Sequence, residues 1–384
     1  MTEDVSAELV VDNGRLKQLC EQWKNTSHLA IDTEFMRVST FYPKSGLIQV
    51  GEAGRNFLLD PLLLTEWQPF VEILTDPGIV KIIHSCSEDL VLFYSEFKCA
   101  PTPLFDTQRA AAFLGFGFSM SYLNLVLKLM DIVLEKSETR SDWLRRPLSA
   151  DQILYAALDV EHLPDLYIEL KDRLQQKGYQ DYFRIECDQL SLVAKNAEDP
   201  AAWDEIYLGL GAAWRLNREQ LGVLKRLCVW REQTARSRDK PRTWIARDAD
   251  LIELAEKRPS DRTLLGQIKD ISRNLQHQDS AAILALIAQS SPVTAQEAER
   301  VDGLPLTQEQ RRVLKRCQHQ IEKLAESTGI ASELLARKKQ LVQLIHLNAG
   351  SASAGAQVRW PASLESAWQR PLIEECLTAA LNHD

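Results

Sequence analysis

The chain has 384 residues, enough for two or three ordinary domains, and its 45% hydrophobic and 26% charged residues are typical of a soluble globular protein. The net charge of −9 excludes a uniformly basic protein, and no apolar run approaches the roughly 20 residues of a membrane helix. The acidic start MTEDVSAELV predicts no secretory leader. Seven cysteines without a Cys-x-x-Cys pair argue against disulfides and zinc, and predict the cytoplasm.

The first half of the chain alternates strand-like and helical patterns. Apolar runs bounded by turn residues predict strands over 29–35, 46–50, 56–60 and 80–85. The first three runs are close together in the sequence, which predicts an antiparallel meander. A long helical pattern then begins at a good N-cap, Ser149, and ends at Gly178. These patterns predict an α/β domain at the start of the chain.

Helical patterns dominate from about residue 199 onward. Two helical clusters are separated by a polar connection, SSPVTAQEAERVDGLPL, that contains two prolines and a glycine. The clusters look like diverged versions of one unit, because each opens with a long helix that interleaves Leu with Arg and Lys. The predicted organisation is an α/β domain over 1–200 and two all-α domains over 208–292 and 303–384.

Two acids stand at the end of the first long apolar strand. Asp32 and Glu34 are two residues apart, so in a strand their side chains point to the same face. Buried carboxylates are costly unless something compensates their charge. A cation, a shared proton and an arginine partner would each do so, and the strand alone does not choose among them.

Three further residues can join these acids. Asp89 lies near the start of a helix that follows a strand, while Tyr155 and Asp159 are four residues apart and share one helix face. Taken singly, Asp89 is a first-turn acid favoured by the helix dipole. By the same standard, Tyr155 is a core aromatic residue and Asp159 is a solvent-facing acid.

The order of these residues along the chain changes that interpretation. Asp-x-Glu on a first strand, Asp at a strand-to-helix junction and Tyr-x-x-x-Asp on a late helix resemble the DEDD exonucleases with a tyrosine in the third motif. The matching segments are IDTEF, HSCSEDL, FDTQRAAAFLG and SDWLRRPLSADQILYAALDVEHL. The stretch DWLRRPL narrows the resemblance to the ribonuclease D family. Both helical clusters resemble HRDC domains, which are nucleic-acid-binding modules, so the resemblance covers essentially the whole chain.

The resemblance implies a ribonuclease H-like exonuclease domain with a mixed sheet flanked by helices, and a site that holds two divalent metal ions. The implied ligands are the carboxylates Asp32, Glu34, Asp89 and Asp159. Oxygen ligands suit Mg²⁺ or Mn²⁺ better than zinc. In a two-metal site one ion activates the attacking water and the other stabilises the leaving 3′ oxygen. Tyr155 would then orient the water, because a tyrosine pKa near 10 makes a poor base.

The activity implied by the resemblance is metal-dependent 3′→5′ exoribonuclease action. It would release nucleoside 5′-monophosphates and trim the 3′ trailers of precursor tRNA and other small structured RNAs. The resemblance further implies that Thr33 and Phe35 grip the terminal nucleotide. His84 is better interpreted as a structural histidine, and Asp106 as a helix N-cap.

A basic segment in the first helical cluster predicts additional RNA contacts. The stretch REQTARSRDKPRTWIAR holds six Arg and Lys residues against two acids. The expected contacts are Arg236, Arg238, Lys240 and Arg242, and the alternative is a solvated basic loop without a ligand. The flanking residues Trp230 and Trp244 are expected in the core, because their neighbours are apolar.

Two other functions stay open at the level of the sequence. DEDD sites act on both RNA and DNA, and no residue pattern indicates a contact to the 2′-hydroxyl that distinguishes them. A DNA 3′→5′ exonuclease is therefore one alternative. A catalytically inactive RNA-binding protein is the other, although the presence of all five motif residues argues against it. The absence of a GxxxxGK[ST] loop excludes a helicase.

We expect a monomer, because no coiled-coil seam is present.

Overall fold

The computed structural model describes residues 5–52, 54–134, 141–269, 271–349 and 357–382. Contacts group the chain into two compact units. The first unit combines Met1–Met36, Lys44–Lys195 and Leu306–Asp384, and the second combines Arg37–Pro43 and Asn196–Pro305. Among the residues described, no helix is both long enough and apolar enough to cross a membrane.

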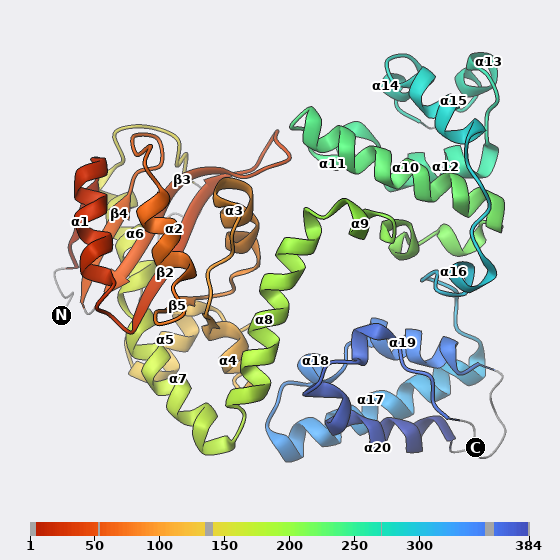
Figure 1. The fold of residues 1–384 in the computed structure, drawn as a ribbon. Coiled ribbons are helices and arrows are strands. Elements are labelled where there is room, and N and C mark those ends of the chain that lie inside the picture. The colour runs from red at the N-terminus through yellow and green to blue at the C-terminus, as the bar shows by residue number, and fades with distance from the viewer. Residues whose placement is uncertain (1–4, 53, 135–140, 270, 350–356, 383–384) are drawn as a thin grey trace. The chain divides into compact units, whose positions relative to one another are not determined.

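A six-stranded sheet in the order β1-β4-β3-β2-β5-β6 forms the centre of the first unit (Figure 1). Its strands are β1 (Ala7–Val10), β2 (His28–Met36), β3 (Lys44–Glu52), β4 (Arg55–Leu59), β5 (Val80–Ile83) and β6 (Leu104–Asp106). The antiparallel meander β2-β3-β4 is confirmed, and the other pairs are parallel, so the sheet is mixed. The sequence prediction missed β1 and β6, because runs of 4 and 3 residues carry too little periodicity.

Helices cover both faces of this sheet. They are α1 (Asn13–Trp23), α2 (Gln68–Thr75), α3 (Ser87–Phe97), α4 (Thr107–Phe113), α5 (Tyr122–Met130), α6 (Ala150–Glu161), α7 (Leu163–Lys177) and α8 (Gln180–Ala197). Side chains alternate between the faces along a strand. Accordingly, Val50 belongs to the large core with Trp23 and Phe70, whereas Leu47 belongs to a smaller cluster with Ala156 of α6.

The long helical pattern that was predicted between Ser149 and Gly178 is two helices. Ser149 is confirmed as the N-cap of α6 within a capping box, and Gly178 ends α7 in the left-handed conformation. The break between α6 and α7 at His162 was not predicted. Pro164 explains it, because proline has no backbone N–H and is tolerated only in the first turn of a helix.

The last segment of the chain folds into a helical module within the first unit. It contains α17 (Gln308–Thr328), α18 (Ser332–Leu335), α19 (Lys338–Leu347), η3 (Ala362–Leu364) and α20 (Gln369–Asn382). The Ala331 amide donates to the Ala112 carbonyl at 2.9 Å, and the ring of Trp368 lies 4.8 Å from that of Phe113. This module therefore shares one hydrophobic core with the α/β domain. The domain boundaries 1–200, 208–292 and 303–384 stay predictions.

The second unit is built around one long helix, α10 (Arg218–Ser237). Its other helices are α9 (Pro200–Trp203), η1 (Ile206–Gly209), η2 (Ala213–Arg215), α11 (Arg242–Ile245), α12 (Asp248–Lys257), α13 (Arg262–Gly266), α14 (Arg273–Gln276), α15 (Ser280–Ala288) and α16 (Ala295–Glu299). Gly222 allows α10 to meet the chain after α15, because a Cβ there would lie 1.9 Å from the Ser291 carbonyl oxygen. The segment Arg37–Pro43 also belongs to this unit.

Candidate active site

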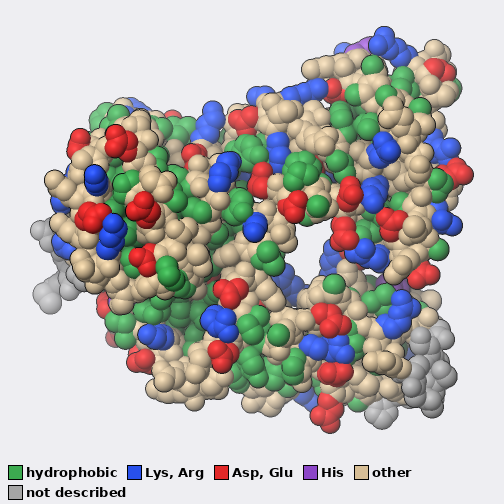
Figure 2. Space-filling view, in the orientation of Figure 1, with side chains coloured by type: hydrophobic (Ala, Val, Ile, Leu, Met, Phe, Trp, Pro, Cys, Tyr) green, Lys and Arg blue, Asp and Glu red, His purple; other side chains and the backbone are tan. Residues whose placement is uncertain are grey.

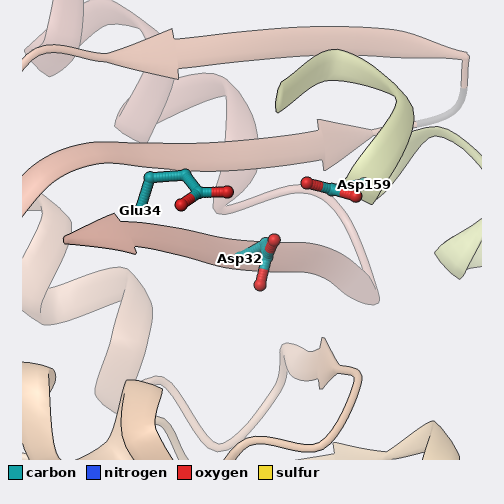
Figure 3. A group of neighbouring side chains, drawn as sticks. All are labelled: Asp32, Glu34 and Asp159. Carbon is teal, nitrogen blue, oxygen red and sulfur yellow. The ribbon is translucent and has the colours of Figure 1, made fainter. Parts of the chain in front are cut away.

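Three carboxylates converge between strand β2 and helix α6. Asp32 and Glu34 project from β2, and Asp159 projects from α6 toward them (Figure 3). One oxygen of each of the three acids lies within 4.8 Å of the others. The period of two in a strand explains why Asp32 and Glu34 share this face. The packing of α6 on β2, β3 and β4 brings the third acid to them.

Asp89 stands at the edge of this group. It lies in the first turn of α3, is 7% exposed, and accepts a hydrogen bond from the Thr33 hydroxyl. Its charge is close enough to help raise the pKa of Asp32. Three of the four predicted ligands therefore form one cluster, and the fourth is attached to β2 through Thr33.

The four acids have raised pKa values, and burial is the largest cause for each. Burial, with the negative charges of Asp159 and Asp89, raises the pKa of Glu34 to about 8. The pKa of Asp159 rises to about 7, and that of Asp89 to about 6. The pKa of Asp32 rises well above its usual value through burial and through the charges of the other three acids. Removing the negative charge, by protons or by a cation, therefore stabilises the site.

The surroundings of the acids bear on whether a cation, a shared proton or an arginine partner compensates their charge. Within the described part of the chain, no lysine or arginine forms an ion pair with Asp32, Glu34 or Asp159. The Oδ2 atom of Asp159 is buried and has no hydrogen-bond partner. A set of oxygen donors with one orphaned oxygen fits a hard divalent cation.

Tyr155 is held against Asp159 on the same face of α6. The two residues are one helical turn apart, and the ring of Tyr155 lies 6.0 Å from the ring of Trp143. Burial, followed by the charges of Asp159 and Glu34, raises the pKa of Tyr155. The phenol therefore keeps its proton and acts as a hydrogen-bond donor, which agrees with a positioning role and not with a free base.

The segment 142–148 in front of α6 is clamped to the sheet by Arg146. The guanidinium donates to both oxygens of buried Asp60, at 2.6 and 2.7 Å, and to the Gly46 carbonyl at 2.7 Å. A Cβ on Gly46 would lie 2.7 Å from the Cβ of Trp143, so only glycine permits this approach. The clamp places Trp143 beside Tyr155. The DWLRRPL stretch was predicted as part of a family motif, without a role for any of its residues.

Two residues near the site are structural, as predicted. His84 Nδ1 lies 2.8 Å from the Thr107 hydroxyl and Nε2 lies 3.1 Å from the Met120 carbonyl oxygen, so both ring nitrogens are occupied. Asp106 accepts from the amides of Gln108 and Arg109 at the start of α4, at 2.8 and 3.0 Å. The interpretations of a satisfied histidine and of a helix N-cap are confirmed.

Thr33 and Phe35, which are predicted to contact the terminal nucleotide, lie near the end of β2. Thr33 is buried and its hydroxyl is engaged by Asp89, while Phe35 is half-buried. The register of β2 against β3 shifts between Glu34 and Phe35, which is a β-bulge at this point. A bulge re-aims the backbone next to the acids.

Three of the four basic residues predicted to contact RNA hold the second unit together. Arg236 pairs with Glu232 at 2.6 Å and with Glu198 at 3.0 Å, and Arg242 pairs with Glu232 at 2.5 Å. Both guanidinium groups also lie over the ring of Phe41, at 4.4 and 4.7 Å. Arg238 pairs with Asp279 at 2.5 Å. In Figure 2, basic and acidic side chains are correspondingly interspersed over this unit.

Lys240 and Trp244 differ from these arginines. Lys240 is exposed, and its Nζ atom lies 5.8 Å from the centre of the Trp244 ring. Trp244 is 55% exposed, so the prediction that it belongs to the core was wrong, whereas Trp230 at 9% is confirmed as buried. The apolar neighbour Ile245 misled the prediction, because α11 has a single turn and only one of its sides meets the core.

The fold and the site define a class of protein. Residues 7–175 match the family model described as 3'-5' exonuclease, and residues 220–287 match the model of the HRDC domain. The mixed sheet flanked by helices and the helical region after it, which were expected for such a protein, are confirmed. The chain therefore carries a 3'-5' exonuclease domain followed by an HRDC domain.

Similar proteins make the assignment specific. The chain is 40% identical over 370 residues to ribonuclease D of Pseudomonas paraeruginosa, with 96% of each chain covered. It is 33% identical over 343 residues to ribonuclease D of Escherichia coli, covering 88% of this chain and 90% of that protein. The crystal structure of Escherichia coli RNase D matches with a TM-score of 0.81 at 30% identity, over 98% of both chains. The chain belongs to the ribonuclease D family and is a 3′→5′ exoribonuclease.

Proposed function

We propose that this exoribonuclease trims the 3′ trailers of precursor tRNA and other small structured RNAs, and that it releases nucleoside 5′-monophosphates. The convergence of Asp32, Glu34 and Asp159 within 4.8 Å is the observation that carries the proposal. The Escherichia coli relative is described as an exoribonuclease involved in structured RNA processing, which supports this class of substrate. A duplex end would have to fray before its 3′ end reached the acids, so we expect a stem to stop the enzyme.

The proposed cation site comprises four carboxylates, Asp32, Glu34, Asp89 and Asp159, which would hold two divalent ions, Mg²⁺ or Mn²⁺. When bound, such ions lower the pKa of a water molecule and stabilise the charge on a leaving oxygen. The chain's own part is to place the substrate and the water. Tyr155 donates its phenol proton in a hydrogen bond and so orients the attacking water. Trp143 keeps that ring in place.

The terminal nucleotide is proposed to lie along the bulged end of β2. The backbone at Thr33 and Phe35 would contact its sugar, and Glu34 would meet the 3′-hydroxyl. The Thr33 hydroxyl already donates to Asp89, so this contact would use the main chain of Thr33, which also pairs with β3 opposite Ile48. Movement of the nucleotide would therefore disturb Asp89, which links substrate position to the acids.

Lys240 and Trp244 are proposed as the principal RNA contact of the second unit. An exposed aromatic ring with a cation beside it suits single-stranded nucleic acid, because a base stacks on the ring and the cation meets a phosphate. The predicted contacts of Arg236, Arg238 and Arg242 stay predictions. Their ion pairs with Glu232 and Asp279 favour a structural role, since each charge is already neutralised.

The test is digestion of a 5′-labelled tRNA-like hairpin that carries a short 3′ tail, beside a DNA strand of the same sequence. Reactions contain Mg²⁺, Mn²⁺ or EDTA. Wild type is compared with Asp32→Asn and with Asp151→Asn, a change to an exposed acid in the first turn of α6. We expect stepwise shortening that needs metal, stops near the stem and is lost only in Asp32→Asn.

Each rival predicts a different pattern in the same assay. Trimming of DNA with intact RNA would replace the proposed substrate by DNA and keep the site. Binding without cleavage of either polymer, in every metal, would favour an inactive RNA-binding protein. A monomer in a reducing compartment such as the cytoplasm is proposed as the working form, and the seven free cysteines are consistent with it.

A further inference from the structure

A glutamine beside the acids has no hydrogen-bond partner. Gln49 lies in the middle of β3 and is fully buried, and neither its Oε1 nor its Nε2 atom is hydrogen-bonded. Buried side-chain amides almost always have partners, because an unsatisfied donor loses its hydration without compensation. The Gln49 amide therefore either destabilises the fold or forms its hydrogen bonds in another state of the protein.

The register of the sheet places Gln49 next to the cation site. It lies directly opposite Asp32 in the antiparallel pair of β3 with β2. Opposed residues of such a pair project to the same face, with Cβ atoms roughly 4.5–5.5 Å apart. On its other side Gln49 opposes Leu58, which belongs to the cluster that contains Ala156 of α6. Gln49 thus lies under the helix that carries Asp159.

A second orphaned group lies on the same face. The Oδ2 atom of Asp159 is buried without a partner, as are both polar atoms of Gln49. A primary amide offers two N–H donors, and ionised carboxylates only accept. The donors and the acceptors are therefore complementary, and the elements that carry them, β3 and α6, pack against each other.

We propose that Gln49 is a positioning residue for the cation site. Its two N–H groups donate to the carboxylates of Asp32 and Asp159 once a divalent cation holds those carboxylates ionised. Carboxylates that ligate a metal are themselves oriented by hydrogen bonds from residues behind them. A neutral amide suits this task, because a lysine or an arginine in its place would neutralise the acids and compete with the cation. This role rests on the proposed cation site.

The competing explanation is that Gln49 is a core residue with a poorly satisfied side chain. Its strand neighbours Leu47 and Ile48 are apolar and fully buried, so an apolar residue at position 49 would suit the surroundings. Under that explanation, replacing the amide improves folding and leaves the cation site untouched. The two explanations therefore differ in cation affinity, which does not depend on catalytic turnover.

The experiment compares full-length Gln49→Met and Gln49→Leu with wild type. Leu47→Met is the matched control, because Leu47 faces the same side of β3 and opposes Glu34. Mn²⁺ affinity is measured by titration calorimetry, and the melting temperature is measured in EDTA and in Mn²⁺. Asp32→Asn removes a proposed ligand, so it shows the Mn²⁺ affinity and the melting temperature that are expected when the cation site is lost.

We expect both Gln49 variants to melt in EDTA no lower than wild type. Their Mn²⁺ affinity should fall about 10- to 100-fold, with a smaller rise of the melting temperature on adding Mn²⁺. Exonuclease activity should return when the Mn²⁺ concentration is raised by the same factor. Leu47→Met should bind Mn²⁺ as wild type does. Two Gln49 substitutions of different shape are used so that a folding defect in one does not decide the result.

Unchanged Mn²⁺ affinity in a folded Gln49 variant would overturn the positioning role and leave the proposed function intact. A wild-type protein that binds no Mn²⁺, with neither heat nor a shift in melting, would instead overturn the cation site and the role of Gln49 with it. The wild-type titration therefore separates the two failures.

Discussion

Replacing Arg146 by alanine tests the clamp in front of α6. The change removes two hydrogen bonds to Asp60, at 2.6 and 2.7 Å, and one to the Gly46 carbonyl, at 2.7 Å. It also removes one each to the carbonyls of Trp143 and Arg145, both at 2.9 Å. The Asp60 side chain is 1% exposed, so it is left as a buried charge without a cationic partner, and only the Leu62 amide still donates to it, at 2.9 Å. The loss therefore exceeds that of an ordinary surface ion pair.

The magnitude follows from the burial of the two partners. Breaking a buried pair by removing one partner costs about 3–5 kcal/mol. The Arg146 side chain is 22% exposed, so water screens it in part and the lower end, about 3 kcal/mol, applies. For a domain of about 200 residues, each kcal/mol lowers the melting temperature by about 2–4 °C, so we expect a fall of roughly 6–12 °C.

The assay is thermal unfolding of Arg146→Ala beside Arg145→Ala. Arg145 is the exposed neighbour in the same segment, and its removal should change stability by about 0.5 kcal/mol at most. Asp60→Asn combined with Arg146→Ala should recover part of the loss, because the buried charge is then gone. A fall no larger than that of Arg145→Ala would refute the clamp.

The other predictions concern the acids, the tyrosine and the second unit. The pKa values are about 8 for Glu34 and about 7 for Asp159, against 4.5 and 3.8 when unperturbed, so the metal-free protein should lose stability as the pH rises from about 4 to 8. The Mn²⁺ affinity should rise over pH 6–8. Melting curves in EDTA and in Mn²⁺ check both predictions, and profiles that do not change with pH would contradict them. Tyr155→Phe should lower kcat roughly 100-fold and keep Mn²⁺ affinity, as single-turnover kinetics and calorimetry will show. Trp244→Ala should weaken binding of single-stranded RNA by about 1–3 kcal/mol, and Lys240→Ala should also reduce the salt slope by about 1 in titrations at several salt concentrations.

The sign of the pH prediction follows from the direction of the shifts. An acid whose pKa is raised by folding holds its proton in the folded state after the unfolded state has lost it. Between the two pKa values the folded state binds more protons, so raising the pH removes stability. A cation displaces those protons and reverses the trend, which is why its affinity grows as the pH rises.

The five candidate site residues were predicted from their order along the chain, which resembles that of a known family, and local periods explain only which of them share a face. Asp32 and Glu34 share a face by the period of a strand, and Tyr155 and Asp159 share one by the period of a helix. Ser149 and Asp106 were correctly predicted as caps because their signals are local, since a cap bonds to amides two or three residues away.

Features that depend on distant partners were not predicted. The basic segment around Arg236 was interpreted as an RNA contact, because its charges were counted without their neighbours. Glu198 lies 38 residues before Arg236, and Asp279 lies 41 residues after Arg238. Local composition contains no information on such pairs, and only the folded chain shows that these charges are neutralised within the protein.

The sequence by itself determined the residue types at the site, their order along the chain and the face of the element on which each one lies, because strand and helix periods are properties of the local backbone. Only the tertiary structure decided which faces meet. It set Gln49 opposite Asp32, clamped Arg146 to Asp60, left Trp244 exposed and joined the last helical module to the exonuclease core. Those contacts arise from packing among segments far apart in sequence, and burial of apolar surface selects them from the whole chain at once.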